Sequence, residues 1–367
     1  MAVLRGEHAN PFELQSFRPL LGSWDLFAVG AADGSHDLDS LQMPLVRLRH
    51  YGRGRLARRV LGDRSSRLLG LRKAVSGCAI VHSAETFLPI SEQAAQLRSR
   101  QGFKLVLTCW ENIPFLYEEG PILARRKSVV REAADLFLAV TERAREALLL
   151  EGVPEDRIVT QPVGVDRGFF RPSARDPAIR ERWGVADDSN VVLYCGRLVR
   201  EKGVLDLVRA VATVPEAVVV IAGSGPEQTR LDLAVRALGL DGRVRFVGPL
   251  PYGRMSEAYA AADVFCLPSV STPYWQEQFG MVLVEAMASG VPIVTTSTGS
   301  IPEVVGPAAM LVPDYSPDAL AEAIGALLGD PDRRHALGEL GLQRVADRYD
   351  AQKVAAAIGS TYERLLA

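Results

Sequence analysis

The sequence predicts an α/β protein with two domains, each formed around a parallel β-sheet, and three observations support this fold class. The chain has 367 residues and 48% apolar content, too much for one ordinary hydrophobic core. From residue 190 onward, short runs rich in β-branched residues alternate with amphipathic segments, as they do in parallel sheets. The first half repeats this alternation less regularly, and two such domains predict a cleft between them.

In the second half, the expected strands and helices follow one another closely. Strands are expected at 191–195, 218–222, 244–248 and 264–268, and helices at 203–214, 226–239, 252–262 and 281–288. Val204, Leu207, Val208 and Val211 have the spacing of one buried helix face. This half is therefore expected to have helices covering both faces of its sheet.

The first half is expected to form a second α/β domain. Strands are expected at 24–31, 78–83, 103–109 and 135–140, and helices at 91–100, 122–133 and 142–151. Residues 161–177 contain Pro and Gly with little periodicity, which is typical of a linker. We expect an N-terminal domain over 1–165, a C-terminal domain over 166–345 and a helical segment over 346–367.

The bulk composition excludes several classes of protein. A net charge of −2 gives no overall attraction to nucleic acid or membrane. The N-terminus lacks the apolar core of a secretory signal, so we expect a cytoplasmic protein. Cys109, Cys195 and Cys266 fall in or at the end of apolar runs without C-x-x-C spacing, and we interpret them as buried thiols.

Two loops that follow strands of the second half have the residues of a phosphate site. Gly196 ends one strand, and Arg197 and Lys202 follow it, where a guanidinium and an ammonium suit a diphosphate. Gly223 and Gly225 follow the next strand, where the backbone can approach a ligand. The alternatives are a surface pair of basic residues and a plain strand-to-helix turn.

The segment 277–292 gives the strongest signal. Met281–Ala288 is an almost wholly apolar helix, yet Glu285 lies in its middle. A buried carboxylate without a partner is costly, so Glu285 is either ion-paired or directed at hydroxyl groups such as those of ribose. Glu277 precedes a helix N-terminus opened by Gly280, where free backbone N–H groups can meet phosphate.

Taken together, these segments resemble the retaining glycosyltransferases of family 4. The resemblance rests on the spacing of Glu277 and Glu285 and on three motifs, G-R-L-x-x-E-K-G, G-S-G-P and F-G-x-x-x-x-E-A-M-A-x-G-x-P. Thr298–Val305 is similar to that family's loop after the next strand. The resemblance implies the GT-B fold, in which two Rossmann-like domains face each other across a cleft and the C-terminal helix crosses back to the first domain.

The resemblance also implies roles for individual residues. Arg197 and Lys202 would neutralise the leaving diphosphate, and Glu285 would bind ribose. Glu277, with the backbone of Phe279, Gly280 and Met281, would hold the donor sugar, and Val247 would lie near the base. No metal would be obligatory, because cationic side chains and helix N-termini neutralise the charge. Asp37-Leu38-Asp39 spells D-x-D in a polar loop, but we do not expect a metal there.

The N-terminal half departs from the family pattern. Similar enzymes often have H-x-H after a first-domain strand, whereas this chain has His82-Ser83-Ala84. His82 is either a core residue or a functional one. Glu85 and Glu111, which follow two expected strand ends, are the alternative catalytic contributors. Gly6 would take the place of a glycine-rich turn near donor and acceptor.

Residues 47–73 contain ten Arg and Lys against one acid, Asp63, with leucines interleaved. This segment can contact an anionic membrane or an anionic acceptor, and the alternative is a solvated surface. Nucleic acid is not expected as a partner.

The sequence thus predicts an enzyme that transfers a sugar from a UDP- or GDP-linked donor to a hydroxyl of a glycan, lipid-linked or small natural-product acceptor. The resemblance implies that the anomeric configuration is retained. One alternative is a protein that binds a nucleotide sugar without catalysis. The other is an NAD-dependent oxidoreductase, although G-x-G-x-x-G followed by an acid is missing.

Overall fold

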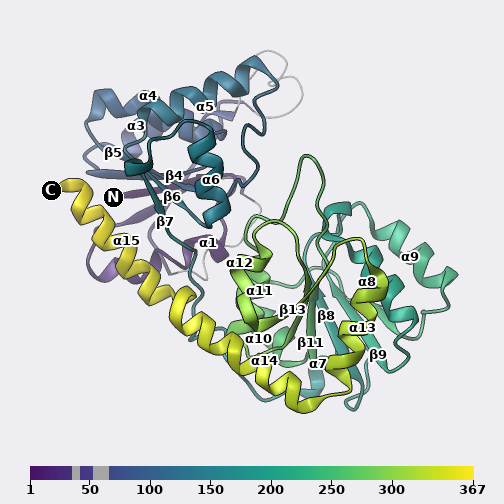
Figure 1. Cartoon of the computed structure of the whole chain (residues 1–367). Helices are drawn as coiled ribbons and strands as arrows, with labels where there is room; N and C mark the ends of the chain where they lie inside the picture. The colour runs from purple at the N-terminus through teal and green to yellow at the C-terminus, as the bar shows by residue number, and fades with distance from the viewer. Residues whose placement is uncertain (35–41, 53–65) are drawn as a thin grey trace. The chain divides into compact units, whose positions relative to one another are not determined.

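A computed structural model describes residues 1–34, 42–52 and 66–367. The chain divides into two compact units (Figure 1). Unit 1 contains Met1–Gly164 together with Ala351–Ala367, and unit 2 contains Val165–Asp350. The units thus divide after Gly164 and after Asp350, whereas the boundaries expected from the sequence lie after residues 165 and 345.

Unit 1 is built on a sheet of seven parallel strands in the order β3-β2-β1-β4-β5-β6-β7. The strands are β1 Ala2–Gly6, β2 Phe27–Ala31, β3 Leu45–Leu48, β4 Ile80–Ala84, β5 Lys104–Cys109, β6 Leu136–Ala139 and β7 Ile158–Thr160. The strand order runs outward in both directions from β1 and β4. Open α/β sheets bind ligands at such a switch point, beside the carboxyl ends of the strands.

Helices cover both faces of this sheet. They are α1 Pro11–Leu14, α3 Leu71–Ala74, α4 Pro89–Gln101, α5 Pro121–Ala133, α6 Glu142–Leu150 and α15 Ala351–Leu366. Alternate strand residues point to opposite faces, so Leu105 and Leu107 join the core under α4, α5 and α6, whereas Val106 joins the core under α1 and α15. Met1 and Leu365 pack against the second core, so both ends of the chain lie on unit 1.

Unit 2 has a sheet of six parallel strands in the order β10-β9-β8-β11-β12-β13. The strands are β8 Asn190–Cys195, β9 Ala217–Ala222, β10 Val244–Phe246, β11 Val264–Leu267, β12 Ile293–Thr296 and β13 Ala309–Val312. Here the switch point lies between β8 and β11. The loops that follow these two strands are therefore the first place to look for a ligand site in this unit.

The helices of unit 2 include the amphipathic one expected from the sequence. They are α7 Pro177–Arg182, α8 Val204–Ala212, α9 Gln228–Ala237, α10 Met255–Ala260, α11 Met281–Ala288, α12 Ile301–Val305, α13 Pro317–Leu328 and α14 Pro331–Arg344. Val204, Leu207, Val208 and Val211 of α8 are all buried, which confirms their predicted face. Contacts join α8 to α13 and α11 to α14.

Several expectations need correction. Ala2–Gly6 is a strand that was not expected, because Arg5 interrupts its apolar run. Helix α9 begins at Gln228, so Pro226 precedes the helix and does not open it. The last helix begins at Ala351 and not at 346, because Val345–Tyr349 forms a π-helical turn that ends in extended backbone at Asp350. The D-x-D of residues 37–39 and residues 53–65 of the basic segment lie outside the described residues.

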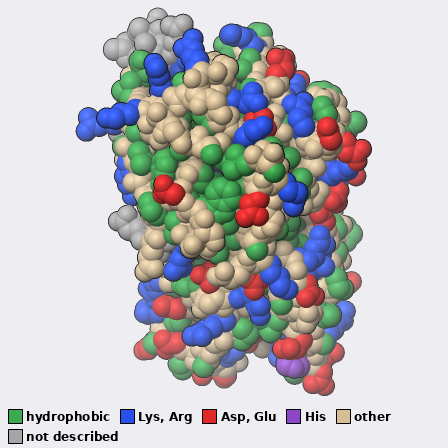
Figure 2. Space-filling model, turned by 90° about the vertical axis from the view of Figure 1, so that its left-hand side faces the viewer, with side chains coloured by type: hydrophobic (Ala, Val, Ile, Leu, Met, Phe, Trp, Pro, Cys, Tyr) green, Lys and Arg blue, Asp and Glu red, His purple; other side chains and the backbone are tan. Residues whose placement is uncertain are grey.

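Acidic and basic side chains are interspersed over the face drawn in Figure 2, as expected for a net charge of −2. Within the part of the chain that the structure describes, no helix is both long and apolar enough to cross a bilayer. Cys109, Cys195 and Cys266 are buried free thiols, as predicted.

Candidate active site

Three loops meet at the carboxyl edge of the sheet in unit 2, and glycines allow their close contact. A Cβ on Gly223 would lie 1.8 Å from the carbonyl oxygen of Gly196, and one on Gly225 would lie 2.3 Å from that of Leu198. A Cβ on Gly203 would lie 1.8 Å from the carbonyl oxygen of Pro268, just after β11. The loop after β8 is therefore pressed against the loops after β9 and β11, and only glycine fits these three positions.

Lys202 and Glu277 form an ion pair at this edge. Lys202 Nζ lies 2.6 Å from Glu277 Oε2, and Ser269 Oγ donates to the same oxygen at 2.8 Å. The ammonium also lies 5.0 Å from the centre of the Trp275 ring, at the range of a cation–π contact. The pair joins the loop after β8 to the segment that leads into α11.

The loop after β12 fixes the backbone of Glu277. Ser300 N donates to Glu277 O at 2.8 Å. Gly299 has a φ of +55°, and a Cβ there would lie 2.2 Å from Glu277 O. The Thr298–Val305 motif therefore holds the backbone of Glu277 in place. The sequence pattern of the motif did not indicate this role.

Arg197 differs from Lys202 in its surroundings. Its side chain is exposed, and within residues 1–34, 42–52 and 66–367 it makes no hydrogen bond or ion pair. Its backbone is fixed, because the Tyr194 hydroxyl donates to Arg197 O at 2.8 Å. The loop after β8 thus carries both an available guanidinium and an ammonium that a carboxylate already holds.

Helix α11 begins at the same edge. Gly280 is its N-cap with a φ of +80°, and a Cβ on Gly280 would lie 3.6 Å from Leu267 at the end of β11. The first N–H groups of an α-helix have no partner within the helix and can receive phosphate oxygens. Phe279 packs edge-on against Tyr349 in the core, so only its backbone can serve a ligand.

Glu285 is buried, 2% exposed, and its partners are phenols and not cations. Tyr259 donates to Oε2 at 2.9 Å and Tyr252 to Oε1 at 3.3 Å. Burial raises the pKa of Glu285 to about 7, against the two tyrosine hydrogen bonds, which lower it. Burial, followed by the charge of Glu285, raises the pKa of the Cys195 thiol, so Glu285 lies near the end of β8. No hydrogen bond joins Glu285 to Arg197 or Lys202 among the described residues.

Val247 follows β10 and lines a pocket of about 410 Å³. Trp183, Arg245 and Phe246 line the same pocket. The backbone N–H of Val247 donates to Ile221 O at 3.1 Å and is therefore already used. A ligand could contact only the backbone carbonyl and the half-buried side chain of Val247.

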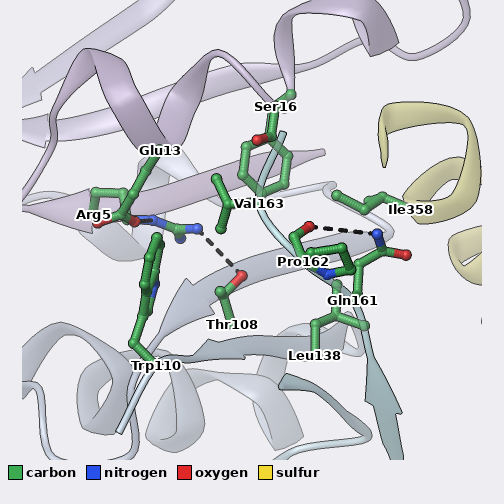
Figure 3. A pocket seen from close by; sticks show the side chains of 11 residues that line it. Arg5, Glu13, Ser16, Thr108, Trp110, Leu138, Gln161, Pro162, Val163 and Ile358 are labelled. Atoms are coloured by element: carbon green, nitrogen blue, oxygen red, sulfur yellow. Dashed lines mark hydrogen bonds and ion pairs between the residues drawn. The ribbon is translucent and has the colours of Figure 1, made fainter. Parts of the chain in front are cut away.

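The switch point of unit 1 contains a buried arginine. Figure 3 shows Arg5 from β1 meeting Glu13 from α1 and reaching toward Thr108 from β5. Arg5 Nε lies 2.7 Å from Glu13 Oε2, and Arg5 also donates to Leu4 O at 3.0 Å. The cavity that these residues and Trp110 line holds only about 20 Å³, enough for a single water molecule.

His82 lies in the core, which agrees with the first of the two interpretations that the sequence left open. It is fully buried in β4, with Nε2 2.7 Å from the Thr108 hydroxyl and Nδ1 hydrogen-bonded to the Tyr362 hydroxyl of α15. Burial, followed by the charge of Arg5, holds the pKa of His82 well below its usual value. The imidazole therefore stays neutral and out of reach of a substrate.

Glu85 and Glu111 lie together, beyond the ends of β4 and β5. Glu85 Oε1 accepts from Trp110 N at 2.8 Å and from Glu111 N at 3.2 Å. Burial, followed by the charge of Glu111, raises the pKa of Glu85 to about 8. Gly6 ends β1 at the neighbouring position in the sheet, with a φ of +56°.

In residues 1–34, 42–52 and 66–367, no three His, Cys, Asp or Glu side chains come together in a way that could hold a metal ion. The sequence did not single out Ser269, Trp275, Tyr252 or Tyr259, which hold Lys202, Glu277 and Glu285. Their only signal is indirect, since a buried acid requires partners.

Comparisons with known proteins agree with this architecture. Residues 175–344 match the family described as glycosyl transferases group 1, and residues 26–169 match glycosyltransferase family 4. D-inositol 3-phosphate glycosyltransferase 1 from Catenulispora acidiphila is 34% identical over 312 residues, which cover 78% of this chain and 72% of that protein. The relative from Corynebacterium jeikeium with the same activity in its name is 34% identical over 249 residues, 63% of this chain and 58% of its own length.

The chain spans about half to three fifths of the length of several such relatives, with 50% for the one from Nocardia farcinica. Solved structures share the fold over the whole chain. HepE from Anabaena, in complex with UDP and glucose, has a TM-score of 0.81 at 20% identity and covers 99% of this chain and 98% of its own. Sucrose-phosphate synthase from Thermosynechococcus elongatus has a TM-score of 0.78 at 25% identity, with 99% and 98% covered. The two Rossmann-like units are those of the GT-B fold, as predicted, and the chain belongs to glycosyltransferase family 4, the group 1 glycosyl transferases.

Proposed function

We propose that this protein transfers a sugar from a nucleoside diphosphate sugar, linked to UDP or GDP, to a hydroxyl group of an acceptor, with retention of anomeric configuration. The observation that carries the proposal is the Lys202–Glu277 ion pair, which joins the loop after β8, where Arg197 also lies, to the segment that leads into the N-terminus of α11. The names of similar proteins also support the proposal. Several relatives are named D-inositol 3-phosphate glycosyltransferases, and one protein of similar fold was solved in complex with UDP and glucose.

In the proposed site, Arg197 receives the diphosphate directly. Lys202 joins it once phosphate oxygens compete with Glu277 for the ammonium, and the freed Glu277 carboxylate then accepts hydrogen bonds from the donor sugar. The backbone of Gly196, Gly223 and Gly225 borders the diphosphate, and the N–H groups near Gly280 and Met281 complete its shell. Glu285 accepts from the ribose hydroxyls, in competition with its two tyrosines.

Charge that develops on the leaving diphosphate is stabilised in this proposal by Arg197 and Lys202, so we infer that no divalent cation is required. As the bond between the anomeric carbon and the diphosphate breaks, a diphosphate oxygen takes the proton of the acceptor hydroxyl. The acceptor oxygen then bonds to the anomeric carbon on the face that the diphosphate left, which gives retention without a covalent nucleophile. Equal rates before and after EDTA treatment are expected. A loss of activity that Mg²⁺ or Mn²⁺ restores would contradict metal independence.

The test has two stages. Nucleotide sugars are first screened by thermal shift, because a ligand that binds only the native state raises its melting temperature. The donor that binds is then incubated with candidate acceptors, while released nucleoside diphosphate and the anomeric configuration of the product are measured. Donor binding without release would support a non-catalytic binding protein, an inverted product would contradict the mechanism, and a change in nicotinamide absorbance would indicate an oxidoreductase.

We further propose a cytoplasmic protein whose residues 47–73 contact anionic membrane at its surface. The ten Arg and Lys of this segment and its interleaved leucines support the proposal. Co-sedimentation with vesicles of anionic lipid, but not with neutral ones, is the expected result. Equal sedimentation with both, or with neither, would contradict it.

A further inference from the structure

The carboxyl edge of the sheet in unit 1 contains a strained acid. Glu85 follows β4 directly, beside the switch point with β1, and has a φ of +57°. A non-glycine residue rarely adopts this backbone conformation, and such residues concentrate at functional sites. Glu85 N donates to Thr108 O at 2.9 Å, so the neighbouring strand β5 holds the residue in this conformation.

Glu85 is buried, and only one of its two carboxyl oxygens has a hydrogen-bond partner among the described residues. The residue is 7% exposed, and Oε1 accepts the two backbone N–H groups of Trp110 and Glu111. Oε2 has no hydrogen-bond partner within the part of the chain that the structure describes. A polar atom so placed is suited to a ligand hydroxyl.

The surroundings of Glu85 are acidic. Glu111 and Glu13 both raise the pKa of Glu85 by their charge, after burial. The cations described nearby face other acids, because Arg5 is buried against Glu13 and Arg126 Nε lies 3.4 Å from Glu92 Oε2. Near pH 7 the Glu85 carboxyl is therefore mostly protonated, and a phosphate group brought to this edge would meet the charge of Glu111 without a described cation to receive it.

Aromatic rings lie next to these acids. The rings of Phe87 and Tyr117 are 4.7 Å apart between centroids, and Tyr117 is 44% exposed. The pKa of Tyr117 is raised by burial and then by the charges of Glu111 and Glu85, so all three groups share one region. Apolar ring faces of this kind pack well against the C–H face of a sugar or a cyclic polyol.

A buried ion cluster fixes the loop that presents Tyr117. Lys127 Nζ lies 2.6 Å from Glu151 and donates to Leu116 O at 3.0 Å, and Phe115 N donates to Glu151 Oε1 at 2.9 Å. Tyr117 itself has a φ of +67°, so its conformation depends on these contacts. The aromatic surface is therefore preorganised, which reduces the entropic cost of binding.

We propose that the acceptor is an uncharged polyhydroxylated molecule, a neutral sugar or cyclic polyol, that packs on Tyr117 and Phe87 and bonds through a hydroxyl to Glu85 Oε2. The inference rests on the proposed function and names the acceptor class for it. It separates this chain from relatives named for D-inositol 3-phosphate, because the charge of Glu111 disfavours a phosphate at this edge, whereas Glu85, whose pKa is about 8, is mostly protonated at pH 7 and can bond a neutral hydroxyl.

The test compares matched acceptors with the donor found by thermal shift. Neutral glycosides and myo-inositol are each paired with a phosphorylated counterpart, D-inositol 3-phosphate among them, and both transfer and calorimetric binding to the donor-loaded protein are measured. We expect at least one neutral acceptor to bind and to react about ten-fold better than its phosphorylated counterpart. Preference for D-inositol 3-phosphate, or binding by none of the neutral acceptors, would overturn the inference.

Variants connect the result to these residues. Glu85→Ala and Tyr117→Ala are expected to raise the acceptor KM about ten-fold and leave the donor KM within about two-fold. Glu111→Gln is expected to narrow the discrimination between neutral and phosphorylated acceptors. Glu119→Gln, which changes an exposed acid of the same loop, is the matched control and should alter neither value. Equal effects of Glu119→Gln and Glu85→Ala on the acceptor KM would also overturn the inference.

Failure of this inference is distinguishable from failure of the proposed function. Transfer to a phosphorylated acceptor overturns the acceptor class and leaves the sugar transfer standing. If no nucleotide sugar raises the melting temperature and no nucleoside diphosphate is released, the proposed function itself fails.

Discussion

Arg197 and Lys202 carry the same charge in the same loop, yet their surroundings predict different consequences of mutation. Arg197 is exposed, so Arg197→Ala should leave the melting temperature unchanged and lower kcat/KM about 100-fold through lost stabilisation of the leaving diphosphate. Lys202→Ala leaves the buried carboxylate of Glu277 without its cation and should cost about 3 kcal/mol of stability as well as activity. Thermal melts and steady-state kinetics of both variants check this difference.

Arg200→Ala is the control for both substitutions, because Arg200 is an exposed arginine of the same loop with no proposed contact to the donor. It should change neither stability nor kcat/KM. If Arg200→Ala and Arg197→Ala reduced activity alike, the general positive charge of the loop would account for the effect, and the assigned contact of Arg197 would be wrong.

Glu285 predicts a dependence of stability on pH. Its folded-state pKa of about 7 lies above the usual 4.5, so the folded protein binds its proton more tightly than the unfolded chain does. Stability from this group is present below pH 4.5 and is lost as the pH rises through 7, by at most about 3 kcal/mol. Glu285→Gln removes this loss. The melting temperature of the variant minus that of the wild type should therefore increase by roughly 5 °C between pH 5 and pH 8.

Two outcomes are informative for Glu285. A difference that does not change with pH would mean that the carboxyl is ionised at both values. If nucleoside diphosphate raised the melting temperature of Glu285→Gln as much as that of the wild type, Glu285 would have no part in binding ribose.

At this scale, the sequence identified acids and cations but not their partners. The carboxyl group of Glu285, buried in an apolar helix, requires hydrogen-bond partners. The hydroxyls of Tyr252 and Tyr259, which lie 33 and 26 residues earlier in the chain, donate to it. No local pattern encodes that contact, because Tyr259 lies in α10 and Tyr252 in the turn before it, and only the tertiary fold brings them to α11. His82 remained ambiguous for the same reason, since its partner Tyr362 lies in the last helix of the chain.

The loops after β8, β9 and β11 act as one packed element, and Gly223 tests that view. A Cβ at this position would overlap the carbonyl oxygen of Gly196, so Gly223→Ala should force the two loops apart and cost more than about 3 kcal/mol. Donor affinity should fall with it, since the backbone edge of the proposed phosphate site moves. Gly242→Ala, where a Cβ meets nothing within 4 Å, is the matched control for melting and for calorimetric donor binding.

Elements were predictable where their pattern is local. The valine-rich runs before Gly196 and Gly223 became β8 and β9, each one residue longer than expected. Strand β1 was missed because Arg5 places a charge in an otherwise apolar run, and its burial depends on Glu13 in the following helix. The start of α15 was missed because the π-helical turn at Val345–Tyr349 keeps a helical pattern across the true boundary.

At the scale of the whole molecule, the two units have separate cores, and α15 belongs to the core of unit 1. Tyr362 is the main anchor of that helix, because it is fully buried, hydrogen-bonded to His82 and packed against Trp24. The packing of α15 on unit 1 combines this aromatic residue with Val354, Ala355 and Ile358 of the same core.

Tyr362→Ala should then weaken one unit and spare the other. Loss of the buried ring and of the His82 hydrogen bond is expected to cost about 3–5 kcal/mol in unit 1, while the core of unit 2 is unaltered. Hydrogen exchange should accelerate in β4 and β5 and stay unchanged in β8 and β11, and the calorimetric affinity for nucleoside diphosphate should stay within about two-fold. Faster exchange in β8 and β11, with weakened nucleotide binding, would mean that the two cores unfold as one cooperative body and that α15 stabilises both.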